Sequence, residues 1–217
     1  MSPPGRPKGE FRSAQHEATP VSSSIDDAAP ISASVPDWSR EAKTWWRWDP
    51  PRSLLASIRA YQRHRRSRNP LRIPLRMLAV LRHRFWSVVT GADIPVNSRL
   101  GGGLCIPHPH GIVIHPAAPI GPNCMIFQQV TIGARDTEGV PRIGGHVDIG
   151  TGAKILGDLT IGDHARIGAN AVVLHDVPAG CTATGVPAKV HLPRTGEPAP
   201  LDQPVLRKPA ATPLIEM

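Results

Sequence analysis

The sequence predicts a mainly β fold, a parallel β-helix of hexapeptide repeats that follows a short α-helical segment. The main observation behind this prediction is that aliphatic residues recur every six positions between Ile94 and Val173. Aromatic residues make up only 4% of the 217 residues, and the chain contains 20 glycines and 25 prolines. A composition so poor in aromatics and so rich in glycine and proline argues against a long-helix bundle.

The recurring aliphatic residues form three columns along the chain. The columns are Ile94, Leu100, Ile106 and Ile112, then Ile114, Ile120, Ile126 and Ile132, and finally Ile143, Ile149, Ile155, Ile161, Ile167 and Val173. A period of six matches neither a helix nor an alternating strand, but it suits a prism with three flat faces in which about 18 residues complete one coil. We expect the column residue to point inward and the glycine that often follows it to turn the corner. Residues 94–185 then form roughly four to five coils.

Two interruptions of the repeat indicate where a site lies. The columns slip by two residues between Ile112 and Ile114, directly after the Pro-His-Pro-His sequence of residues 107–110. Residues 134–141 then form a polar insertion between the second and third columns. Insertions project from the body of a repeat protein and often build its binding face, so both interruptions point to a functional site.

Residues 38–90 precede the repeats and are predicted to be helical and strongly basic. Between residues 41 and 90, Lys43 and eleven arginines face only two acidic residues, Glu41 and Asp49. Apolar residues at helical spacing predict two amphipathic helices, and two prolines place the start of the second no earlier than about residue 73. The first helix presents Leu54, Leu55, Ile58 and Tyr61, and the second presents Leu71, Leu75, Leu78, Phe85 and Val89. We expect these faces to pack against the main domain and the arginines to be solvated.

The basic segment also bears on possible partners. No aromatic stacking pattern or known DNA-reading motif accompanies the charge, so nucleic acid is not an expected partner. Peripheral contact with an anionic membrane surface stays open, because Trp45, Trp46 and Trp48 lie close to the basic helices in the sequence.

The two ends of the chain are predicted to be tails. Residues 1–37 are rich in Pro, Ser and Ala and form a predicted disordered N-terminal tail, and residues 193–217 form a Pro-rich C-terminal tail. The start of the chain lacks the apolar region of a signal peptide, and no run of about 18 apolar residues occurs. Three cysteines are too few for a disulfide framework. A reduced, cytoplasmic protein is therefore expected.

Five short motifs give residues 91–192 a resemblance to a known family. They are Gly-Ala-Asp-Ile at 91–94, His108 followed by Gly-Ile-Val-Ile at 111–114, Gln-Gln-Val-Thr-Ile-Gly at 128–133, Ile-Gly-Thr-Gly-Ala-Lys-Ile-Leu-Gly at 149–157, and Gly-Val-Pro-Ala-Lys at 185–189. On these motifs the segment resembles the left-handed β-helix acyltransferases with hexapeptide repeats, and among them the serine acetyltransferase branch.

The resemblance implies an acetyl-CoA-dependent O-acetyltransferase without a metal ion. It implies that His108 is the general base, that Asp93 pairs with it, and that the protein is a homotrimer with acetyl-CoA bound between neighbouring prisms. An imidazole with a pKa near neutrality can accept the proton of a hydroxyl as the oxygen attacks a thioester. The residues implied in binding the cofactor are Gly133, Ala134, Thr151, Ala153, Ala169 and Lys189.

The sequence departs from the serine acetyltransferase pattern at two positions. Pro107 stands where an Asp usually precedes the catalytic His, and Val140 stands where a His usually precedes Pro141. The acceptor can therefore be L-serine, as in cysteine biosynthesis, or a sugar hydroxyl, as in exopolysaccharide synthesis. A non-enzymatic β-helix scaffold is the further alternative. We expect Cys105 to be a packing residue rather than a nucleophile, and His110 and His115 to be exposed turn residues.

Overall fold

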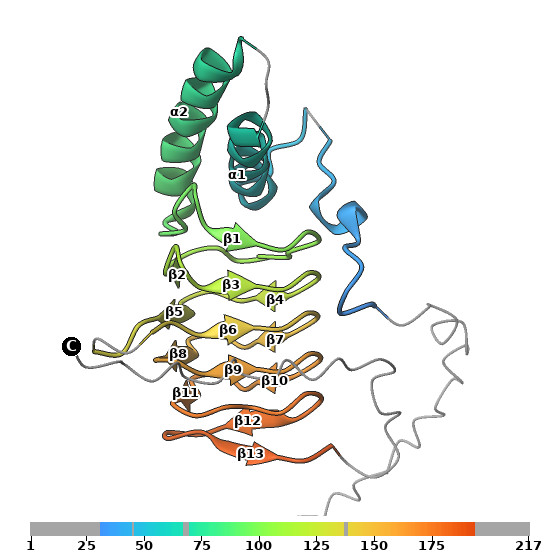
Figure 1. The fold of residues 1–217 in the computed structure, drawn as a ribbon, viewed down its shortest axis with the longest axis vertical. Helices are drawn as coiled ribbons and strands as arrows, with labels where there is room; N and C mark the ends of the chain where they lie inside the picture. The colour runs from blue at the N-terminus through green and yellow to red at the C-terminus, as the bar shows by residue number, and fades with distance from the viewer. Residues whose placement is uncertain (1–30, 45, 67–69, 137–138, 194–217) are drawn as a thin grey trace, which may run out of the picture. The chain divides into compact units, whose positions relative to one another are not determined.

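A computed structural model describes residues 31–44, 46–66, 70–136 and 139–193 (Figure 1). The predictions for residues 1–30 and 194–217 lie outside these described residues. The helical elements are η1 (Trp38–Glu41), α1 (Pro50–Arg66) and α2 (Arg72–Thr90). The strands are β1 (Arg99–Leu100), β2 (Val113–Ile114), β3 (Pro119–Ile120), β4 (Met125–Ile126), β5 (Thr131–Gly133), β6 (Arg142–Ile143), β7 (Asp148–Ile149), β8 (Lys154–Leu156), β9 (Thr160–Ile161), β10 (Arg166–Ile167), β11 (Val172–Val173), β12 (Thr182–Thr184) and β13 (Lys189–His191).

The strands form three parallel sheets, each of which is one face of a prism. The strand orders are β1-β3-β6-β9, β13-β12-β10-β7-β4 and β11-β8-β5-β2. From β2 to β11 most strands pair with the strand that follows three positions later in the chain, so three strands complete one coil. Only the β12–β13 pair among these named strands is antiparallel, at the end of the stack. The prediction of a mainly β fold with stacked parallel strands is confirmed.

The six-residue columns form the core of the prism. Ile114, Ile132, Ile155 and Val173 occupy matching positions on successive coils of one sheet. Each of them is buried, as are the small residues four positions after a column residue, such as Ala118, Cys124, Ala153 and Ala171. Each inward aliphatic side chain therefore packs on its counterpart in the next coil, which explains why the core needs no aromatic residue.

The corners of the prism contain glycine, as expected, but the glycine directly after a column residue is not the residue whose φ turns the chain there. Gly101 and Gly121 have no positive φ, but a Cβ on Gly101 would lie 2.5 Å from the carbonyl carbon of Gly121. These glycines are required because successive coils approach too closely for a side chain. The left-handed conformation falls two residues later, at Asn123 (φ 60°) and at equivalent positions of other coils.

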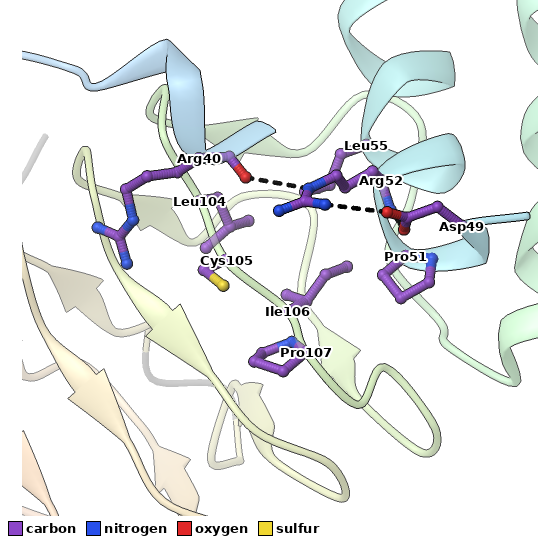
Figure 2. A pocket seen from close by; sticks show the side chains of 9 residues that line it. All are labelled: Arg40, Asp49, Pro51, Arg52, Leu55, Leu104, Cys105, Ile106 and Pro107. Atoms are coloured by element: carbon purple, nitrogen blue, oxygen red, sulfur yellow. Dashed lines mark hydrogen bonds and ion pairs between the residues drawn. The ribbon is translucent and has the colours of Figure 1, made fainter. Parts of the chain in front are cut away.

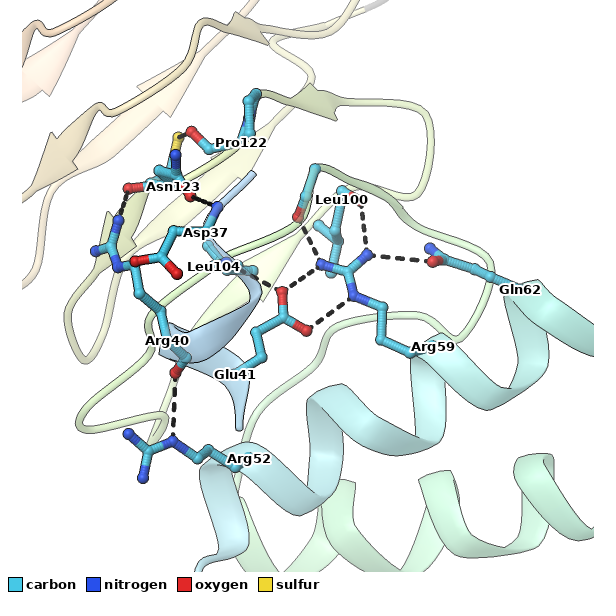
Figure 3. A network of polar contacts seen from close by, with 12 residues as sticks. Asp37, Arg40, Glu41, Arg52, Arg59, Gln62, Leu100, Leu104, Pro122 and Asn123 are labelled. Atoms are coloured by element: carbon cyan, nitrogen blue, oxygen red, sulfur yellow. Dashed lines mark hydrogen bonds and ion pairs between the residues drawn. The ribbon is translucent and has the colours of Figure 1, made fainter. Parts of the chain in front are cut away.

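Helix α1 covers the first coil of the prism. Leu54, Leu55 and Ile58 belong to the same buried cluster as the column residues, as predicted for the first helix. Figure 3 shows that the Arg59 guanidinium donates to the carbonyl oxygen of Leu100 (2.7 Å) and pairs with Glu41 (2.7 Å). Arg59 thus donates to the carbonyl oxygens of Leu100 and Gly101, at the end of the prism where the β1 strand has no further coil beside it.

Residues 31–37 were expected to belong to the disordered tail, but the structure corrects this expectation. The fully buried side chain of Asn123 donates to the carbonyl oxygens of Ser32 (2.7 Å) and Val35 (2.8 Å). It also accepts a hydrogen bond from the backbone N–H of Asp37 (2.7 Å), as Figure 3 shows. Composition alone could not indicate this contact, because its partner lies 86 residues away along the chain.

The apolar face predicted for the second helix does not pack against the main domain. Leu71, Leu75, Leu78, Phe85 and Val89 are all exposed on or beside α2. Instead, α2 turns Ala79, His83 and Thr90 inward, and His83 Nε2 lies 2.8 Å from the carbonyl oxygen of Ile94. The helix starts at Arg72, with Pro74 in its first turn, close to the predicted start.

Candidate functional site

The turns that carry several predicted site residues stack along one edge of the prism. This edge, named here the His108 edge, consists of residues 107–111, 127–129, 150–152 and 168–170. Backbone N–H groups link each turn to the one before it: Gln129 donates to His110 (2.9 Å), Gly152 to Gln128 (2.9 Å) and Asn170 to Thr151 (2.7 Å). The tertiary structure thus brings His108, Thr151 and Ala169 onto one edge although they lie on different coils.

The Gly-Val-Pro-Ala-Lys motif continues the same region. Gly185 accepts a hydrogen bond from the N–H of Val172 (3.0 Å), and Ala188 donates to the carbonyl oxygen of Val172 (2.8 Å). The motif therefore runs alongside β11, the last strand of the sheet that borders the His108 edge. Lys189, at the start of β13, is exposed.

His108 and Asp93 both lie at the first coil with exposed side chains. The backbone of Asp93 pairs with the strand after the His108 turn, through Asp93 N to Ile112 O (2.8 Å) and Ile114 N to Asp93 O (3.0 Å). Among the described residues, no hydrogen bond joins the Asp93 carboxylate to the His108 imidazole. The pairing of these two side chains stays a prediction.

The outer face of the sheet beside this edge carries a lysine that the sequence analysis did not single out. Lys154 Nζ donates to the carbonyl oxygen of Gln129 (2.6 Å) and to Thr131 Oγ1 (3.1 Å). Gln128, which precedes Gln129 in the chain, has a buried Oε1 atom without a hydrogen-bond partner among the described residues. Both residues fall inside quoted motifs, which was the available signal for them.

The residues predicted to bind the cofactor differ in their access to a ligand. Ala134, Ala169 and Lys189 are exposed, and a Cβ placed on Gly133 would have no neighbour within 4 Å. Ala153 is 0% exposed, its N–H donates to Gly150 and its carbonyl oxygen accepts from Thr131. The side chain of Ala153 therefore faces the core, and its part in binding the cofactor stays a prediction.

A cavity of about 210 Å³ lies between the start of α1 and the first coil, next to the His108 turn (Figure 2). Its walls include Pro107, Cys105 and Leu55, and its rim carries an ion pair between Arg52 and Asp49 (3.0 Å). Arg52 also donates to the carbonyl oxygen of Arg40 (3.3 Å). The cavity offers both charges and an apolar floor to a small polar molecule.

The cysteines and histidines of the described part of the chain show no cluster of three or more possible metal ligands. Cys105 is half-buried and pairs with Met125 across neighbouring coils. Burial raises the pKa of the Cys124 thiol to about 12, so this thiol stays protonated and acts as a packing residue.

Comparison with known proteins shows similarity to serine acetyltransferases. Residues 141–175 match the family model described as bacterial transferase hexapeptide (six repeats). The serine acetyltransferase of Synechococcus elongatus is 41% identical over 106 residues, which are 48% of this chain and 43% of that relative. The chain spans about half the length of the curated relatives it matches.

Two solved structures extend this similarity to the fold. The soybean serine acetyltransferase apoenzyme is 35% identical with a TM-score of 0.50, and the match covers 66% of this chain and 70% of that one. The Brucella abortus serine acetyltransferase in complex with coenzyme A is 30% identical with a TM-score of 0.56. That match covers 65% of this chain and 55% of the other.

Proposed function

Because the chain belongs to the hexapeptide-repeat acyltransferases, in their serine acetyltransferase branch, we propose that it transfers an acetyl group from acetyl-CoA to the hydroxyl of L-serine. One observation carries this proposal. The motifs of the resemblance, which are scattered over residues 91–189, all border one sheet of the prism and the His108 edge.

In the proposed mechanism His108 is the general base. Its imidazole accepts the proton of the serine hydroxyl while the oxygen attacks the thioester carbonyl carbon, and it returns the proton to the departing thiolate of CoA. The carboxylate of Asp93 orients the imidazole and stabilises its protonated form. Backbone N–H groups near Gly133 and Ala134 stabilise the oxyanion of the tetrahedral intermediate. The acetyl group passes directly to the acceptor, so no enzyme residue is acylated.

The surface beside the sheet suits acetyl-CoA. The open space at Gly133 leaves room for a long ligand, and the exposed ammonium of Lys189 is available to a CoA phosphate. Thr151 and Ala169 belong to the His108 edge, which borders the same sheet as Gly133. A relative of similar fold has been solved with coenzyme A bound, which supports the same co-substrate here.

A sugar hydroxyl is the second candidate acceptor. It is favoured by Pro107, which supplies an apolar wall to the cavity beside His108 where serine acetyltransferases usually have a carboxylate. Val140 likewise replaces a histidine and packs partly buried against the core. These two positions leave the serine ammonium and carboxylate with fewer charged partners.

The proposal includes three further features of the protein: the handedness of the coils, the oligomeric state and the location. The hexapeptide model and the relatives of known structure support left-handed winding of the coils. The family also implies a homotrimer, in which a neighbouring prism supplies the other wall of the acetyl-CoA groove. A cytoplasmic location is the third feature, since acetyl-CoA is a co-substrate found inside cells. The mass measured by light scattering tests the trimer, and a purely monomeric active enzyme would contradict it.

The decisive experiment measures release of CoA thiol from acetyl-CoA by the full chain with L-serine, homoserine or free sugars as acceptor. His108→Ala should lower turnover by roughly 10²–10⁴-fold, the usual contribution of a general base. Asp93→Asn should lose less, because the imidazole remains. Cys105→Ser is the control and should retain activity, since no acyl-thiol intermediate is involved.

A titration with CoA and a thermal melt accompany these assays. Since His108 is exposed at a turn, His108→Ala should keep the CoA affinity and melting temperature of the unmodified chain. Near-normal turnover of this variant would overturn the mechanism. Absence of thiol release with every acceptor would overturn the proposed activity and favour a non-enzymatic scaffold.

A further inference from the structure

Helix α2 carries a broad apolar face on its outer side. Its inner side is formed by the buried residues Ala79, His83 and Thr90. The outer face, named here the α2 outer face, consists of Met77, Leu78, Leu81, Phe85 and Val88, each of which is more than half exposed. A helix on the surface of a water-soluble domain normally shows the reverse arrangement, so this face is expected to have a partner.

The charged side chains of α1 and α2 are all positive. Ten arginines and no Asp or Glu occur between residues 50 and 92. Helical periodicity places Arg82 and Arg84 on opposite borders of the α2 outer face, and both side chains are exposed. The partner must therefore accept an apolar helix face and offer negative charge along both of its borders.

Tryptophans extend the apolar surface at the carboxyl-terminal half of α2. Trp48 is 70% exposed, and its ring lies 5.4 Å from the half-buried ring of Trp86. Trp46 is 73% exposed in the same segment. Indole rings favour the boundary between lipid headgroups and acyl chains, because they combine an apolar body with a polar N–H.

We propose that the α2 outer face binds the surface of an anionic phospholipid membrane. The helix lies in the plane of the interface, its apolar side chains enter the acyl boundary, and Arg82 and Arg84 reach the phosphates of the headgroups. In the described part of the chain no helix is long and apolar enough to cross a membrane. The contact is therefore peripheral, and it does not depend on the proposed acetyl transfer.

A second copy of the chain related by a two-fold axis fits this face less well. Such a contact would bring the same surface of two copies together, and so it would set arginines against arginines. No carboxylate between residues 50 and 92 could compensate for that repulsion. In a trimer the α2 outer face would instead meet a different surface of its neighbour, and the oligomeric state measured below tests that arrangement. An anionic bilayer supplies the missing negative charge and the apolar environment together.

The test is flotation of the full chain with vesicles at low salt. We expect binding to phosphatidylglycerol-rich vesicles to be at least about tenfold stronger than binding to phosphatidylcholine vesicles, because each arginine near an anionic surface adds affinity. High salt should reduce this preference by screening the charges. Arg82→Ala with Arg84→Ala should reduce it as well.

Matched substitutions separate the α2 outer face from general hydrophobicity. Leu81→Gln with Val88→Gln should abolish flotation without changing the melting temperature, since both side chains are exposed. Leu192→Gln removes an equally exposed apolar side chain at the other end of the described chain and should leave flotation unchanged. Equal binding to neutral and anionic vesicles, or none to either, would overturn the proposal. A smaller oligomer in the Leu81→Gln, Val88→Gln variant would also overturn it, because a second copy would then cover the face.

Discussion

His146 and His164 meet on successive coils, at the prism edge that also contains Asn123. Their Nδ1 atoms lie 2.8 Å apart, so one nitrogen donates a hydrogen bond and the other accepts it. Burial lowers the pKa of His146, the charges of His164, Arg40 and Arg166 act in the same direction, and Asp148 opposes them. The neutral form of His146 is therefore the form that fits the folded protein.

This pair predicts a loss of stability in acid. The unfolded chain protonates His146 near its ordinary value of 6.5, whereas the folded chain resists protonation. Above about pH 6.5 His146 is neutral in both states and does not lower the free energy of unfolding. As the pH falls from 6.5 toward the lower pKa of the folded protein, the unfolded chain binds a proton that the folded chain does not, so the protein loses stability. Melting temperatures between about pH 7 and pH 5 should fall less steeply for His146→Asn, since Asn tolerates the local φ of 51°. His175→Asn changes an exposed histidine and should keep the slope of the unmodified chain; an equal slope in all three proteins would contradict the prediction.

At the scale of elements, α1 is joined to η1 by an ion pair that water barely reaches, and the same arginine donates hydrogen bonds to the first coil. The side chains of Arg59 and Glu41 are only 14% and 8% exposed, and the guanidinium also serves the carbonyl group of Leu100. Arg52, on the same helix, pairs with Asp49 but is 42% exposed. Solvent exposure therefore distinguishes two ion pairs that look alike in the sequence.

Removal of the two arginines should have very different effects. Arg59→Ala leaves the nearly buried Glu41 carboxylate with the backbone N–H of Leu104 as its remaining partner and removes the donor to the carbonyl oxygens of Leu100 and Gly101, so it should lower the free energy of unfolding by about 3–5 kcal/mol. Arg52→Ala should cost less than about 1 kcal/mol, because an exposed pair contributes little. Urea unfolding of both variants measures the difference, and similar midpoints would show that α1 does not stabilise the end of the prism.

At the scale of the whole molecule, residues 31–37 join the start of the described chain to the middle of the prism. Removal of residues 1–30 should change neither turnover nor melting temperature, because the contacts to Asn123 begin at Ser32. Removal of residues 1–37 strips the buried Asn123 side chain of three partners and should destabilise the protein by about 1–3 kcal/mol. Calorimetry of the two truncated proteins tests this, and equal melting temperatures would show that the segment contributes nothing.

Much of the candidate site could be predicted because short motifs carry it. His108, Thr151 and Ala169 were identified as single residues, and the exposure of the first and last is compatible with their proposed roles. The burial of Ala153 follows from the period of six, because it lies four positions after the column residue Ile149, but the motif does not say how a buried residue contributes to binding the cofactor. Lys154, the next residue, points outward and bonds across the coils.

By itself, the sequence determined the prism. A column residue every six positions can bury its side chain in only one repeating way, so the period specified the faces, the stacking and the core. Only the tertiary structure decided which side of α2 faces outward, why Gly101 must be glycine and what Asn123 binds. Each of these depends on groups in other elements: α1 and Ile94, which α2 contacts, the backbone of the next coil, and residues 32–37. A local pattern shows that a residue has a preferred environment, but distances across coils decide which neighbour provides it.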